Sequence, residues 1–143
     1  MQLPQHNIVK RCASVLLVIM CVSGLASADL LEWDANGAAS PNPSGGSGVW
    51  SETNSNWWNG ADAQAYNTGA TPHDTVIGVT AGAISISSPV TAGSLRFDVG
   101  RYVLTGSDLT LSDSGVISVT NSSDTAWIGA SIAGNVGLTK TGD

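Results

Sequence analysis

The second half of the chain is a ladder of short segments in which apolar and polar residues alternate, separated by turns rich in Gly, Asp, Asn and Ser. Residues 84–87, 95–98, 109–112 and 117–120 have the sequences Ile-Ser-Ile-Ser, Leu-Arg-Phe-Asp, Leu-Thr-Leu-Ser and Ile-Ser-Val-Thr. A period of two is typical of a β-strand with one buried face. Because no helical apolar period occurs after residue 28, the sequence predicts an all-β fold.

The ladder also repeats itself, since Gly-Ala-Ile-Ser-Ile-Ser at residues 82–87 recurs as Gly-Val-Ile-Ser-Val-Thr at residues 115–120. Three such strands per coil would give roughly 20 to 30 residues per turn, a period typical of solenoids. We therefore expect a right-handed parallel β-helix, a β-solenoid, of about three coils. A small β-sandwich has similar strand spacing and remains an alternative, because short strands do not distinguish parallel from antiparallel pairing.

The alternation assigns one face of each strand to the core, because a slip of one residue would expose every apolar side chain. The predicted inward positions are Val76, Ile84, Ile86, Leu95, Phe97, Leu109, Leu111, Ile117, Val119, Ile128 and Ile132. The last coil, around residues 128–138, is expected to leave an unpaired strand edge that invites self-association.

The first 28 residues have the order of a secretory signal peptide. Lys10 and Arg11 precede an apolar run over residues 12–22, and Ala-Ser-Ala at residues 26–28 predicts cleavage between Ala28 and Asp29. The apolar run is shorter than the ~20 residues of a spanning helix, and no second one follows. An uncleaved signal anchor is the alternative. We expect export through the inner membrane, a secreted or cell-surface location, and membrane contact only through this segment.

Removal of the signal peptide would leave a strongly acidic chain without cysteine. Residues 29–143 contain all 11 acidic residues but only three basic ones, a net charge of −8, and both cysteines lie before residue 29. Nucleic-acid binding is therefore disfavoured, because it needs cations to neutralise phosphates. Disulfides and thiolate metal sites are also excluded from that part of the chain.

Residues 29–73 differ from the ladder, since they contain four of the five tryptophans among many Asn, Gly, Ser and Pro residues. Short strands are expected near residues 30–34, 49–51 and 57–58. A solenoid must cover its first open edge, so this region is predicted to be an N-terminal cap. The chain would then divide into a signal peptide (1–28), a cap (29–73) and solenoid coils (74–143).

The tryptophans of the cap have two interpretations. Trp50, Trp57 and Trp58 could stack on sugar rings, as amphipathic aromatic side chains do at binding surfaces. Alternatively, they plug the open end of the solenoid, where apolar mass is needed. The second interpretation is favoured.

Acid–base catalysis and metal binding have weaker signals. Clustered carboxylates with a basic residue could act on a polysaccharide. The candidates are Asp98, Asp108, Asp113 and Asp124 with Arg96 and Arg101. Most of these aspartates neighbour Gly, Ser or Asn, which favours a turn role. Asp34 begins a D-x-N-G sequence like that of a calcium loop, but the later ligands are missing, so an Asx-turn is expected. His73 has no second His or Cys to complete a zinc site.

Several motifs, taken in order, resemble a known family. They are Leu-Glu-Trp-Asp-Ala-Asn-Gly at 31–37, Gly-Val-Trp at 48–50, Asn-Trp-Trp at 56–58, Ser-Leu-Arg-Phe at 94–97 and Gly-Leu-Thr-Lys-Thr-Gly at 137–142. The chain resembles the N-terminal part of exported bacterial proteins with autotransporter-associated β-strand repeats. The resemblance implies a parallel β-helix passenger that is secreted or displayed. In that family G-L-x-K-x-G opens a repeat, so this chain is expected to end just inside the first one.

These observations lead to one preferred function and two alternatives. The preferred function is a structural passenger with an adhesive, matrix or spacer role, without catalysis and without a cofactor. Its expected partners are a surface glycan or matrix component, or a second copy at the open C-terminal edge. The alternatives are a carbohydrate-binding module and, less favoured, a β-helical polysaccharide lyase or hydrolase.

Overall fold

A computed structural model describes residues 29–37, 43–69 and 71–142 of this chain. The predicted signal peptide, including Ala28 of its cleavage site, lies outside the described residues. The described part is all-β and contains no helix. Its strands are β1 (Leu30–Trp33), β2 (Gly48–Trp50), β3 (Trp57–Trp58), β4 (Ala63–Gln64), β5 (His73–Ile77), β6 (Ala83–Ile86), β7 (Val90–Phe97), β8 (Tyr102–Gly106), β9 (Leu109–Val119), β10 (Ala126–Ile128), β11 (Ile132–Ala133) and β12 (Thr139–Thr141).

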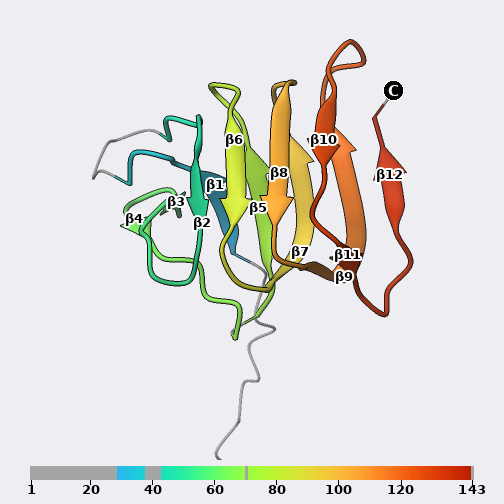
Figure 1. Ribbon diagram of the computed structural model, residues 1–143, viewed down its shortest axis with the longest axis horizontal. Coiled ribbons are helices and arrows are strands. Elements are labelled where there is room, and N and C mark those ends of the chain that lie inside the picture. The colour runs from blue at the N-terminus through green and yellow to red at the C-terminus, as the bar shows by residue number, and fades with distance from the viewer. Residues whose placement is uncertain (1–28, 38–42, 70, 143) are drawn as a thin grey trace, which may run out of the picture.

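The strands form two facing sheets, and the chain passes from one sheet to the other as it winds (Figure 1). One sheet has the order β11-β9-β7-β5-β1-β3-β4, with β12 also paired to β9, and the other has the order β10-β8-β6-β2. Every pairing between successive coils is parallel, and antiparallel pairing among the described strands is limited to β1–β3 and β3–β4. The prediction of a β-solenoid of about three turns is therefore confirmed, and the sandwich alternative is wrong.

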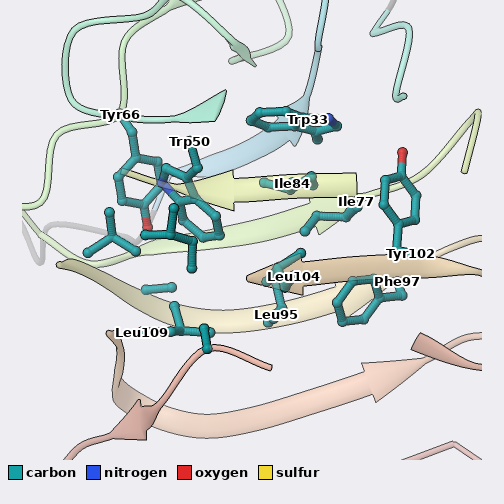
Figure 2. Close-up of a cluster of buried hydrophobic side chains, with 14 of the residues drawn as sticks. Trp33, Trp50, Tyr66, Ile77, Ile84, Leu95, Phe97, Tyr102, Leu104 and Leu109 are labelled. Carbon is teal, nitrogen blue, oxygen red and sulfur yellow. The ribbon is translucent and has the colours of Figure 1, made fainter. Parts of the chain in front are cut away.

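The register places inward residues of successive coils directly over one another. Thr75 pairs with Leu95, and Leu95 pairs with Ile117, while Ile84 pairs with Leu104 on the facing sheet. Figure 2 shows Ile84, Leu95 and Leu104 between the two sheets. The alternating pattern predicts most of this core: Ile84, Ile86, Leu95, Phe97, Leu109, Leu111 and Ile117 are buried in one cluster, and Val119 and Ile128 pack against it.

One of the predicted inward positions is wrong, and another has the inward register without being buried. Val76 is buried, but its register partners are Glu32 and Arg96, so it belongs to the outer face of its sheet. The sequence Thr-Val-Ile is apolar in both phases of the alternation, which leaves the phase of β5 undetermined. Ile132 is 41% exposed. It lies over Leu109, and no described strand lies beyond it to cover its side chain.

The first coil comes from the tryptophan-rich region. β1 pairs in parallel with β5, and β2 pairs in parallel with β6. The segment between β2 and β5 contains β3 and β4, which extend the first sheet beyond β1 and cover that edge. β3 is antiparallel to β1, and β4 is antiparallel to β3. The three-part division of the chain stays a prediction. Across residues 29–37, 43–69 and 71–142, no helix is present that is long and apolar enough to span a membrane.

Candidate functional site

Aromatic side chains fill the first coil of the solenoid. Trp50 and Trp57 are completely buried, and their ring centroids lie 4.7 Å apart at an interplanar angle of 63°. The ring centroids of Trp33 and Trp57 lie 5.2 Å apart at an interplanar angle of 74°. Those of Tyr66 and Trp50 lie 4.9 Å apart at an angle of 73°. Edge-to-face contacts of this kind add stability beyond that of the buried area alone. The result is an aromatic plug, defined here as Trp33, Trp50, Trp57 and Tyr66. Figure 2 labels Trp33, Trp50 and Tyr66 of this plug.

Four different segments supply the side chains of the plug. Contacts between these side chains therefore hold the segments of the first coil together. The three tryptophans come from β1, β2 and β3, and Tyr66 comes from the stretch after β4. The Tyr66 hydroxyl donates a 2.9 Å hydrogen bond to the carbonyl oxygen of Thr91 in β7. This bond joins the segment between β2 and β5 to β7, the strand that follows β5 in the sheet. His73 borders the plug, and its ring centroid lies 5.3 Å from that of Tyr66. Both ring nitrogens of His73 lack a hydrogen-bond partner among the described residues.

The burial of the plug bears on the predicted glycan site. Trp50 and Trp57 are inaccessible to solvent, and Trp58 is only 8% exposed. Their rings contact protein atoms, as the plug interpretation expects. Stacking of these three side chains on sugar would require the cap to open, and it stays a prediction.

A second buried tyrosine holds the loop between β5 and β6. The Tyr102 hydroxyl donates to the carbonyl oxygens of Gly78 and Thr80 and accepts a 3.0 Å bond from the backbone N–H of Gly46. Burial raises the pKa of Tyr102, and the bond from Gly46 opposes that rise. Burial also raises the pKa of Tyr66, and the neighbouring carboxylate of Asp74 raises it further.

The candidate catalytic residues occupy solvent-facing positions around the corners of the coils. The Asp98 carboxylate accepts 2.8 Å and 3.1 Å bonds from the Arg96 guanidinium and a 2.7 Å bond from the Thr120 hydroxyl. The Asp124 carboxylate accepts a 2.9 Å bond from the Asn121 amide. The other candidates, Arg101, Asp108 and Asp113, are exposed, and φ is positive at Arg101 and Asp113. The bond from Thr120 joins neighbouring coils, whereas the bonds from Arg96 and Asn121 are local contacts within one coil.

Glycines make room for the two corner aspartates. A Cβ added at Gly78 would lie 3.2 Å from the Cβ of Asp98, and one added at Gly100 would lie 2.8 Å from the Cβ of Asp124. Each aspartate therefore sits over a glycine of the preceding coil.

Asp34 has a structural environment that differs from the expected Asx-turn. Its Oδ1 accepts bonds of 3.0 Å and 2.6 Å from the backbone N–H and hydroxyl of Ser44, while the turn bond from Gly37 goes to its backbone carbonyl. The buried carboxylate thus holds the chain around residue 44 against the end of β1. In the part of the chain that the structure describes, no group of three or more His, Cys, Asp or Glu side chains could hold a metal ion.

Sequence reasoning did not single out Trp127. This side chain is 59% exposed, whereas the other four tryptophans are at most 8% exposed. It lies on β10 beside Val103 of β8, one residue out of phase with the inward Ile128. The alternating pattern around residue 128 was a signal that could have placed it on the outer face.

We expect Trp57→Ala to lower the free energy of unfolding by about 3–5 kcal/mol, because truncation leaves a cavity inside the plug. Trp127→Ala is the matched control, since an exposed position should change stability by no more than about 0.5 kcal/mol. Urea unfolding followed by circular dichroism measures both. Equal effects of the two substitutions would contradict a structural role for the plug.

The raised tyrosine pKa values predict a loss of stability at alkaline pH. In the unfolded chain tyrosine ionises near its ordinary pKa of 10.0, whereas the folded chain keeps the protons to higher pH. The unfolded state then binds fewer protons, so the free energy of unfolding falls as pH rises above that value. The slope should reach about 1.4 kcal/mol per pH unit for each retained proton.

Phenolate absorbance and circular dichroism, recorded together, test this linkage. The two signals should change at the same pH, and Tyr66→Phe should reduce the slope. Ionisation of both tyrosines near their ordinary pKa, without loss of structure, would contradict the buried placement.

Comparison with known proteins gives one informative similarity. No protein-family model and no solved structure matches the chain. The chain is 37% identical, over 139 residues and 93% of its length, to a protein described as "Adhesin BmaC autotransporter" from Brucella suis biovar 1 (strain 1330). The match spans 4% of the length of that relative. This similarity confirms the resemblance drawn from the motifs, and together with the stacked parallel coils it is consistent with the passenger β-helix of an autotransporter adhesin.

Proposed function

We propose that this chain is an adhesive segment of a secreted or cell-surface protein of the autotransporter class. The observation that carries the proposal is its 37% identity over 93% of its length to a protein described as an autotransporter adhesin. Secretion also follows from the predicted signal peptide. The proposal includes no catalysis, and it places binding on the outer surface of the coils.

The structure supports a scaffold role on physical grounds. A stack of parallel coils buries one continuous apolar core and leaves its outer faces free to vary, as in other solenoids that use extended surfaces for binding. The surface polar network at Asp98 holds coils together. The preferred partner is a surface glycan or a matrix component, and a matrix or spacer role belongs to the same proposal.

Adhesion can be tested with beads that carry the purified chain. We expect such beads to adhere to a cultured cell monolayer or to an extracellular-matrix gel, because adhesion needs only surface presentation of the folded coils. Beads that carry the heat-unfolded chain at equal density are the control. Equal retention of native and unfolded beads on both surfaces would contradict the proposal.

We also propose self-association through the C-terminal edge of the coils. Among the described strands, β10, β11 and β12 each pair with a neighbour on one side only. Residues 131–142 are almost all exposed, and they include Ile132 at 41% and Leu138 at 59%. Unpaired strand edges with apolar side chains are templates for pairing with another chain. A second copy is the occupant that this proposal commits to.

Sedimentation at increasing concentration should detect a dimer or larger species that Ile132→Lys disrupts, because an inward-pointing charge blocks an edge. Val79→Lys is the control, since it adds the same charge at an exposed position (62%) between β5 and β6. A monomer at high concentration would contradict the proposal, as would equal effects of the two lysines.

A further inference from the structure

One exposed aromatic ring stands apart from the buried aromatic side chains. The five tryptophans, two tyrosines and one phenylalanine of the chain are all described, and seven of these eight side chains are at most 8% exposed. Trp127 is 59% exposed. Its indole combines a large apolar surface with a polar N–H, a combination that is enriched at binding surfaces.

The ring of Trp127 has a defined position over the backbone of Gly129. A Cβ added at Gly129 would lie 2.3 Å from Cη2, 2.7 Å from Cζ3 and 3.0 Å from Cζ2 of the indole. Any side chain at residue 129 would therefore displace the ring. The glycine lets the six-membered ring lie close against the sheet, which restricts its orientation before any ligand binds. Such pre-organisation lowers the entropic cost of binding.

The outward side chains aligned with the ring are small and uncharged, and the nearest cation in the sequence is the exposed Arg101, just before β8. The register aligns Trp127 with Val103 and Ala83 of the neighbouring strands. The adjacent outward column contains Ser85, Thr105 and, on β2, Val49. None of these outward side chains is charged, although the whole chain has a net charge of −6.

The chemistry of this face suits a small, flat ligand. A sugar ring needs little more than the area of an indole. Its apolar C–H face suits the π surface, and its hydroxyl groups suit the Ser85 and Thr105 hydroxyls.

We propose that Trp127, backed by Gly129, is a stacking platform for a neutral sugar ring, with the outer face of β6, β8 and β10 as the rest of the binding surface. An anionic sugar is disfavoured, because the excess negative charge of the chain would repel it. The inference rests on the proposed adhesive function and identifies a ligand class for it. The platform is separate from Trp50, Trp57 and Trp58.

Binding of soluble oligosaccharides to the purified chain tests the platform. Cellohexaose and chitohexaose are the neutral probes, and an oligogalacturonate of equal length is the anionic comparator. Since Trp127 is the exposed tryptophan, acrylamide should quench mainly its fluorescence, and a bound neutral probe should protect it. Trp127→Ala should weaken binding about tenfold or more, which corresponds to ~1.4 kcal/mol.

Two further variants separate the ring from general surface effects. Gly129→Val keeps the indole but displaces it, so it should lose affinity while circular dichroism stays native. Leu138→Ala removes an aliphatic side chain with the same exposed fraction, 59%, and should leave affinity unchanged. Trp127→Phe should retain part of the affinity.

The outcomes distinguish this inference from the proposed function. Neutral-probe binding that depends on Trp127 and Gly129 supports the platform. Absence of binding to both neutral probes, equal binding by Trp127→Ala, or tighter binding of the oligogalacturonate would overturn it. Bead adhesion that persists in Trp127→Ala after any of those results would leave the adhesive function standing on other contacts. Failure of wild-type beads to adhere would remove the adhesive function itself.

Discussion

Each coil of this protein is held by side chains that lie directly over their counterparts in the neighbouring coil. Parallel pairing keeps this alignment through both sheets, so that inward residues, most of them aliphatic, lie over inward residues of the next coil. The hydrogen bonds between coils and the burial of the core thus depend on the same register. A shift of one residue would lose both, because every inward side chain would turn to solvent. The stability of the fold is therefore distributed along the stack, and each level depends on the one beside it.

The first coil cannot follow this rule, because it has a neighbour on one side only. Its open side is filled by large rings instead of aliphatic side chains, and by a short antiparallel pair, β3 and β4, that covers the sheet edge. Hydrogen bonds connect this region to later parts of the chain: the Tyr66 hydroxyl donates to Thr91, and the backbone N–H of Gly46 donates to the Tyr102 hydroxyl. The tryptophan-rich composition of residues 29–73 is therefore a consequence of geometry, since one end of a solenoid must be closed by something other than a coil.

The sequence predicts the strands and the core well, because a period of two is a direct consequence of strand geometry. Ile84, Leu95 and Leu109 lie inward as their alternation indicates. The pattern fails at Val76, where apolar residues occupy both phases, and at Ile132, where burial depends on a neighbouring level that periodicity does not reveal. Long-range contacts are less accessible to sequence reasoning. The bond between Asp34 and Ser44 and the bond between Tyr66 and Thr91 both depend on how separate segments meet in space.

The corner glycines have a consequence for how such a sequence can vary. Gly78 lies under Asp98, and Gly100 lies under Asp124, at sequence separations of 20 and 24 residues. In each pair the space available to one side chain is set by its partner one turn away. A larger residue at Gly100 would overlap Asp124, and one at Gly78 would require the Asp98 side chain to shift by a few tenths of an ångström. Substitutions at these corners should therefore be coupled in pairs, and a comparison of related sequences would find correlated changes about one turn apart.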